Sequence, residues 1–198
     1  MITSAQINKK LREKTGFLFC YCAILIFSIF LQNNMTLGTH IVIGAAATRV
    51  LGATHPILGF FIGLASHYLS DFIPHWDYKL SSLSGRKTSA ERRWGSKKLF
   101  VLDLGKIAID FFVGAIIVAI FWPNSFTQSF FLLAAIFIGS TLPDFLQGLY
   151  FTHKFDLILN PHQRFHDFMH TKIKLGAYPT IGIPSQIIIF LLSLYFIS

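Results

Sequence analysis

The sequence predicts an all-α fold, a polytopic transmembrane bundle of about five to six helices built from helical hairpins. Two observations carry this prediction. Of the 198 residues, 53% are hydrophobic and 13% are charged, whereas a soluble domain has about 25% charged residues. The apolar residues also gather in runs long enough to cross the hydrocarbon core of a bilayer. A soluble protein of this size would need more polar surface than the composition supplies.

The apolar runs define the expected helices. At about 1.5 Å per residue, five runs have membrane dimensions, namely residues 17–31, 57–73, 101–122, 126–148 and 179–197. A sixth run, 37–53, carries His40 and Arg49, and its small residues suit close helix packing. Breaks at Thr54-His55-Pro56 and Pro123-Asn124-Ser125 predict two tight turns between helices. Residues 79–99 are expected to form a basic loop, and residues 150–178 a longer polar stretch.

The order of these runs predicts three regions. Residues 1–34 join a basic stretch to an apolar segment, residues 35–178 form a helical core, and residues 179–198 form a C-terminal transmembrane helix. Residues 1–16 are also basic, like the loop at 79–99, so both favour the same side of the membrane. Three interpretations stay open. Segment 17–31 crosses against its charge bias, or 37–53 does not cross, or Met35 is the real start, which is the interpretation we favour.

The basic charge points to lipid. The net charge is +8, and seven basic residues and one acid fall between Lys79 and Lys98. Basic blocks that flank apolar runs follow the positive-inside bias, so we expect a multi-pass protein of the cell (inner) membrane with residues 79–99 in the cytoplasm. The expected partners are membrane lipid and the anionic headgroups near this loop. No nucleic-acid partner is expected, because the loop has no interleaved aromatics beyond Trp94. The oligomeric state is left open.

Acids and histidines within the apolar runs are the informative feature. A charge in a bilayer costs at least a few kcal/mol. Yet Asp71, Asp103, Asp110 and Asp144 lie inside or at the ends of these runs. His67 and Asp71 are four residues apart, so a helix presents both on one face.

Hairpin geometry brings further groups to the same level. A hairpin folded about His55 places position 40 opposite position 70, so His40 lies at the depth of His67 and Asp71. A hairpin folded about Asn124 places Asp144 opposite position 104. His166 and His170, again four residues apart, follow at the same membrane face.

This pattern predicts a divalent metal site, with zinc as the first choice. Two histidines with a carboxylate suit zinc, and also iron or manganese, and one ion or two fit equally well. The predicted metal ligands are His40, His67, Asp71, Asp144 and His170. The plainer alternative is that these residues form hydrogen bonds and ion pairs that only support packing. Asp103, Lys106 and Asp110 are interpreted in that way, as a structural stripe along one helix.

Several of these motifs resemble a known family. Residues 55–78 (HPILGFFIGLASHYLSDFIPHWDY) carry a His-x-x-x-Asp followed by Pro-His, here His67, Asp71 and Pro74-His75. Thr39-His40 precedes this segment, and the string GSTLPD that ends at Asp144 and the pair His166 and His170 follow it. Residues 36–175 thereby resemble the membrane-bound predicted metal-dependent hydrolases and, more distantly, the zinc-dependent phospholipase C proteins. Where those membrane hydrolases usually carry Asp-x-Asp-His, Asp144 is followed by Phe-Leu-Gln, so the resemblance does not extend to a second metal.

We therefore expect a membrane-embedded metal-dependent hydrolase that acts on an ester or phosphoester of a lipid-like substrate at the cytoplasmic face. His75, His166 and His170 are the expected catalytic residues, because imidazole can protonate a leaving group near neutral pH. Two non-catalytic alternatives stay open, a small transporter or proton relay and a scaffold whose metal staples the hairpins. A water-filled path past Asp71 and Asp110 to both faces would favour transport.

Overall fold

The computed structural model describes residues 37–75, 80–84, 89–123, 126–170 and 178–198. The chain divides into two compact units, residues 1–34 and residues 35–198. The predicted apolar segment 17–31, with the three interpretations of its topology, lies outside the described residues.

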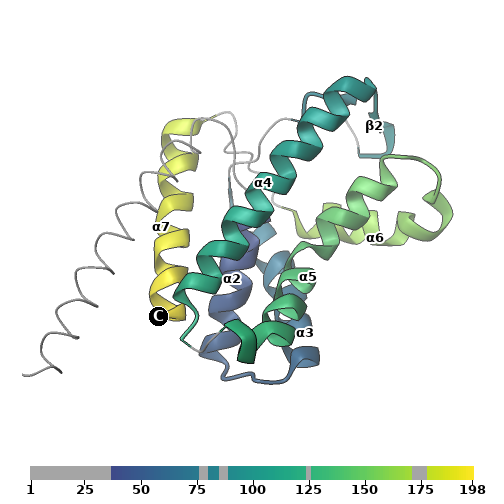
Figure 1. Ribbon diagram of the computed structural model, residues 1–198. Helices are drawn as coiled ribbons and strands as arrows, with labels where there is room; N and C mark the ends of the chain where they lie inside the picture. Colours follow the sequence, from purple (N-terminus) through teal and green to yellow (C-terminus); the bar gives the residue numbers. More distant parts are fainter. Residues whose placement is uncertain (1–36, 76–79, 85–88, 124–125, 171–177) are drawn as a thin grey trace, which may run out of the picture. The chain divides into compact units, whose positions relative to one another are not determined.

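The described part of the chain is all-helical, as predicted (Figure 1). A two-stranded antiparallel sheet pairs Leu83–Ser84 with Arg93–Trp94. Residues 150–178, which the sequence presented as a polar stretch, contain an additional helix at Asp156–Met169. Its apolar residues are interspersed with polar ones, so they form no run of membrane length in the sequence. The elements are α2 (Leu37–Val50), α3 (Pro56–Asp71), β1 (Leu83–Ser84), a 3₁₀ turn (Ser89–Glu91), β2 (Arg93–Trp94), α4 (Lys97–Phe121), α5 (Phe126–Tyr150), α6 (Asp156–Met169) and α7 (Pro179–Ile197).

Three of these helices mark the chain as a membrane protein. Within the described residues, Lys97–Phe121, Ser129–Tyr150 and Thr180–Ile197 are long and apolar enough to cross a membrane. The helices α2 and α3 are shorter, with 14 and 16 residues. Many large apolar side chains on the three long helices are exposed, as expected for surfaces that face lipid.

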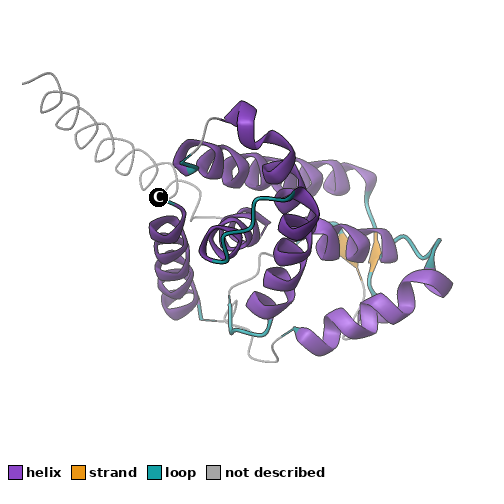
Figure 2. Ribbon diagram, turned by 90° about the horizontal axis from the view of Figure 1, so that it is seen from below, coloured by secondary structure: helices purple, strands orange, loops and turns teal. Residues whose placement is uncertain are grey.

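Helix α2 is the buried centre of the bundle. It packs against α3, α4, α5 and α7, and the view from below shows it between α7 and the α3–α5 pair (Figure 2). Ile41, Val42 and Ala45 have no exposed surface. A helix that is buried on every side needs apolar or small residues all round, and the segment LGTHIVIGAAATRV meets that need.

An acid in the apolar run of α4 has a structural partner at the start of α2. Asp110 Oδ2 accepts hydrogen bonds from the backbone N–H groups of Leu37 (2.8 Å) and Gly38 (3.2 Å). The first N–H groups of a helix have no partner within the helix, and they attract negative charge. Asp110 therefore caps α2, which accounts for a carboxylate in this run.

Helices α3 and α5 approach each other closely at two glycines. A Cβ on Gly63 would lie 2.7 Å from the Ile136 carbonyl oxygen, and a Cβ on Gly139 would overlap the Phe60 carbonyl oxygen. Small residues let helix backbones approach in this way. His67 follows Gly63 by one turn and Asp144 follows Gly139 by five residues, so this contact brings the two side chains to one level.

The described part of the basic loop is fastened to α4 and α5. Asp103 Oδ2 accepts hydrogen bonds from the Ser82 backbone N–H and hydroxyl, both at 2.7 Å, and Lys106 Nζ donates to Asp103 Oδ1 at 3.0 Å. Trp94 Nε1 donates to the Gly148 carbonyl at 2.8 Å. The predicted structural pair of Asp103 and Lys106 is thus present, and it also anchors the loop.

Candidate metal centre

The last turn of α3 supplies two groups of the centre. Pro56 stands in the first turn of the helix, and Pro74 follows three residues after its end at Asp71. His67 and Asp71 are four apart on one face, and their side chains are 0% and 2% exposed. His67 Nε2 lies 3.3 Å from Asp71 Oδ2. The pair that the sequence spacing predicted is therefore formed and buried.

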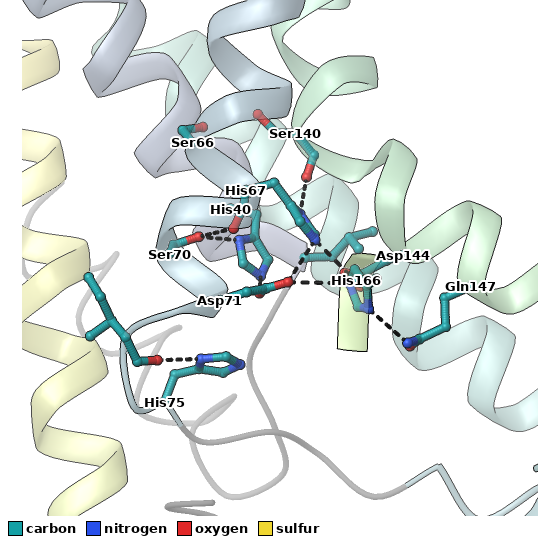
Figure 3. A network of polar contacts seen from close by, with 12 residues as sticks. His40, Ser66, His67, Ser70, Asp71, His75, Ser140, Asp144, Gln147 and His166 are labelled. Carbon is teal, nitrogen blue, oxygen red and sulfur yellow. Dashed lines mark hydrogen bonds and ion pairs between the residues drawn. The ribbon is translucent and has the colours of Figure 1, made fainter. Parts of the chain in front are cut away.

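Three other helices each add a side chain to this pair (Figure 3). From α2, His40 Nε2 lies 3.4 Å from Asp71 Oδ1. From α6, His166 Nε2 lies 3.2 Å from Asp71 Oδ2. From α5, Asp144 Oδ1 lies 3.7 Å from both His67 Nε2 and His166 Nε2. The centre is thus built by α2, α3, α5 and α6.

Four ligand atoms in this cluster lie close enough together to share one ion. Zinc bonds of about 2.0–2.1 Å to nitrogen and oxygen place neighbouring ligand atoms roughly 3.3–3.4 Å apart in a tetrahedron. The four nitrogen–oxygen distances are 3.2 and 3.3 Å, which are near this value, and 3.7 and 3.7 Å, which are longer. The atoms are His67 Nε2, Asp71 Oδ2, Asp144 Oδ1 and His166 Nε2.

Hydrogen bonds at the other ring nitrogen orient the imidazoles. His67 Nδ1 lies 2.7 Å from the Ser140 carbonyl oxygen, which can only accept, so Nδ1 carries the proton. Ser70 Oγ donates to the His67 carbonyl and lies 2.8 Å from His40 Nδ1, so His40 Nδ1 donates to Ser70. In the neutral rings of His40 and His67, Nε2 is then unprotonated and faces Asp71. Metal-binding histidines usually have such an outer hydrogen bond.

Three buried atoms at the middle of the cluster lack a hydrogen-bond partner in the described part of the chain. Within the described residues, His67 Nε2, Asp71 Oδ2 and His166 Nε2 are buried and have no hydrogen-bond partner. An imidazole lone pair facing a carboxylate oxygen at 3.3 Å is unfavourable unless a proton or a cation lies between them. The residues therefore fit a divalent cation, and groups of three that could hold one are present here.

The cluster extends beyond these four atoms. Ligand atoms of Asp71, His75 and His170 also lie within 4.8 Å of one another, as do those of His40, His67 and Asp71. The His75 and His170 rings are 4.9 Å apart, and His75 Nδ1 donates to the Ile73 carbonyl at 2.8 Å. Asp71 belongs to both of these groups, which makes it the residue that the whole cluster shares.

Every residue predicted from the sequence as a ligand or a catalytic group lies in this cluster. The arrangement places His166, predicted as a catalytic residue, beside Asp71 and Asp144 in a ligand position. His170, predicted in both roles, lies with His75 at the edge of the cluster. The members are His40, His67, Asp71, His75, Asp144, His166 and His170.

Sequence reasoning missed the groups that support the histidines. Besides Ser70 and the Ser140 carbonyl, the Gln147 side-chain amide lies 3.0 Å from His166 Nδ1. Pro143 lies inside the same stretch of α5. Because proline has no N–H, the Gly139 carbonyl four residues earlier receives no helical hydrogen bond from it. A serine or glutamine in an apolar run carries no signal of this role. Only the spacing of Asp144 and Gln147, three residues apart on one helix face, could have suggested it.

His162 is a further, partly buried histidine beside the centre. It lies four residues before His166 on α6, and the two rings are stacked with centroids 5.9 Å apart. Burial lowers the pKa of His162.

The fold and the site together define a helical membrane protein with a buried histidine and aspartate cluster that could hold a metal ion. In comparisons with protein-family models, curated proteins and solved structures, nothing matched this chain.

Proposed function

We propose that this protein is a membrane-embedded metal-dependent hydrolase that cleaves an ester or phosphoester of a lipid-like substrate at the cytoplasmic face of the cell (inner) membrane. The observation that carries the proposal is the convergence of three buried ligand atoms that have no hydrogen-bond partner among the described residues, namely His67 Nε2, Asp71 Oδ2 and His166 Nε2. The outer hydrogen bond of His67 holds its ring so that Nε2 faces this point.

The donor set favours zinc. His67, Asp71, Asp144 and His166 would hold the ion through two nitrogens and two oxygens, with His40 against the second oxygen of Asp71. With these four groups as ligands, a zinc ion would take water or substrate as a fifth ligand, and it would then lower the pKa of that water and polarise an ester or phosphoryl oxygen. Iron or manganese could occupy the same donors.

Asp144 marks the open side of the centre. Its side chain is 28% exposed, whereas those of His67, Asp71 and His166 are at most 2% exposed. The scissile group would therefore approach beside Asp144. His75 and His170, at the edge of the cluster, are the groups that we assign to protonation of the leaving group.

The surroundings favour an amphipathic substrate. The centre belongs to a bundle with three helices that can cross a membrane. The exposed basic residues of the neighbouring segment would attract anionic headgroups. Those in the described residues are Arg92, Arg93, Lys97 and Lys98.

The test is metal analysis of detergent-purified protein together with a hydrolysis assay on phospholipid and phosphomonoester substrates. The wild-type protein should carry a divalent ion and hydrolyse one of these substrates. His67→Ala should lose both properties. If that variant does not fold, Asp144→Asn takes its place, since it keeps the side-chain volume and should also lose activity. His153→Asn, a change outside the cluster at a position where asparagine tolerates the backbone conformation, is the matched control. Full metal occupancy in His67→Ala would refute the ligand assignment.

A metal-stapled scaffold is the second candidate, because the ligand atoms come from four different helices. Such an arrangement would fasten α2, α3, α5 and α6 together even without a reaction. A protein that binds the ion stoichiometrically, loses thermal stability on chelation and hydrolyses neither substrate would support the scaffold and overturn the enzyme proposal.

A further inference from the structure

Helix α6 is amphipathic in the reverse sense to a helix on a soluble protein. Its inward face is largely polar, because two of its three buried residues are Gln163 and His166, and the third is Leu159. Its outward face carries Leu157, Ile158 and Phe168, which are 93%, 74% and 78% exposed. At 100° per residue, Leu157 and His166 lie on opposite sides of the helix.

From this arrangement we infer that α6 lies in the membrane interface and that its outer face is immersed among lipid acyl chains. A helix of 14 residues with a polar inner face is too short and too polar to cross a bilayer. A strongly amphipathic helix of this kind binds in the plane of the interface.

The position of α6 in the chain supports lipid as the occupant. Five residues separate the end of α5 from the start of α6, and nine residues separate the end of α6 from the start of α7. Both neighbours are candidate membrane spans, so each end of α6 is tethered near a membrane boundary. The apolar surface also continues from α6 onto α3, since the Phe165 and Tyr68 rings are 4.9 Å apart and the adjoining Leu69 is exposed.

Charge on α6 agrees with this placement. Arg164 and Lys154 are exposed beside the apolar face, where they can reach anionic headgroups. The helix is roughly 10–12 Å wide. Lipid at its outer face would therefore lie about one helix diameter from His166 on its inner face. The inference is independent of hydrolysis, since an interfacial α6 would serve a scaffold equally well.

The test is spin-label accessibility in vesicles of phosphatidylcholine and phosphatidylglycerol, with the full chain carrying Cys20→Ser and Cys22→Ser. Single labels are introduced by Leu157→Cys and Phe168→Cys, with Ile158→Cys in reserve if either fails to purify. Asn160→Cys is the polar-edge control on the same helix, and Phe131→Cys marks the exposed surface of the α5 span. Collision with oxygen reports lipid, and collision with a soluble nickel chelate reports water.

We expect the ratio of oxygen to nickel collision at 157 and 168 to be several-fold higher than at 160 and similar to that at 131. Equal nickel access at 157, 168 and 160 would overturn the inference. Labels at 157 and 168 shielded from both reagents would also overturn it, because a protein surface would then cover the face. Repeating the measurement in Asp71→Asn separates this result from any failure of the proposed hydrolase, since the lipid contact should persist there.

Discussion

Asp71 is the residue on which the centre depends. Its Oδ1 faces His40, its Oδ2 faces His67 and His166, and it shares a further group with His75 and His170. A buried carboxylate surrounded by imidazoles is costly unless protons or a cation compensate its charge.

Replacement of this carboxylate should abolish metal binding. Asp71→Asn keeps the size of the side chain but removes its charge and one oxygen ligand, so we expect metal affinity to fall by at least about 100-fold. Equilibrium dialysis with zinc measures the effect. Asp103→Asn is the matched control, because Asp103 is equally buried but binds Ser82 and Lys106. Equal losses in both variants would show a general unfolding effect.

The outer hydrogen bond of His40 should tune the same affinity. Ser70→Ala removes the oxygen that accepts the proton of His40 Nδ1, so the ring can rotate or change its tautomer. We expect zinc affinity to fall by about 10–100-fold. Ser70→Thr retains the hydroxyl and should restore most of the affinity. An unchanged affinity in Ser70→Ala would show that His40 takes no part in binding.

His153, which lies outside the centre, should make the stability of the folded protein depend on pH. Its hydrogen bonds to Asp156 (2.9 Å) and to the Arg92 carbonyl (2.8 Å) raise its pKa. A raised folded pKa stabilises the protein below the unfolded value of about 6.5, and this stabilisation is lost as the pH rises through the folded pKa. The stability gap to His153→Asn should therefore be larger at about pH 5.5 than at about pH 8.5.

Thermal unfolding in detergent at the two pH values measures this gap. Asparagine is a suitable replacement because His153 has a φ of 55°, a left-handed conformation that asparagine tolerates. A gap that does not change between the two pH values would contradict the assignment of a raised pKa.

At the scale of elements, the approach of α3 to α5 sets the geometry of the centre. Gly139 lies against the Phe60 carbonyl, and Gly63 lies against the Ile136 carbonyl. Backbone atoms cannot yield as a flexible side chain can, so a larger residue must push the helices apart.

Gly139→Ala should therefore destabilise the protein by about 1–3 kcal/mol and weaken metal binding, because it moves Asp144 away from His67. Gly105→Ala is the matched control, since a Cβ at that α4 position meets nothing within 4 Å. There alanine should stabilise the helix by about 0.5–1 kcal/mol. Chemical unfolding in detergent and zinc dialysis provide the two measurements. Destabilisation by both substitutions would contradict the close-approach argument.

At the scale of the whole molecule, one cation would couple four helices. An ion that binds only the folded bundle stabilises it by about 4 kcal/mol when its free concentration is 1,000 times its Kd. Chelation should therefore lower the melting temperature of the wild-type protein, and added zinc should raise it again. Asp71→Asn should show neither shift. A melting temperature that ignores chelation in the wild type would contradict a structural contribution of the ion.

Composition and residue spacing were enough to predict the helical class, the apolar helices and the pairing of His67 with Asp71. These features depend on composition and on the 3.6-residue period of the helix, which are local. The level of His40 also followed, because a short turn at His55 fixes how two adjacent helices align. The structure supports the pairing of His67 with Asp71 and the level of His40, because His40 lies at one oxygen of Asp71 and His67 at the other.

Which helices lie side by side could be seen only in the folded chain. A hairpin about Asn124 placed Asp144 level with Asp103, yet α5 packs mainly against α3 and α4 mainly against α2. Asp144 therefore faces His67, and Asp103 binds Ser82. His166 reaches the centre because α6 packs back against α5 and α3. The choice of packing partner depends on surfaces far apart in the chain, such as the glycines of α3 and α5, and no local pattern in the sequence encodes it.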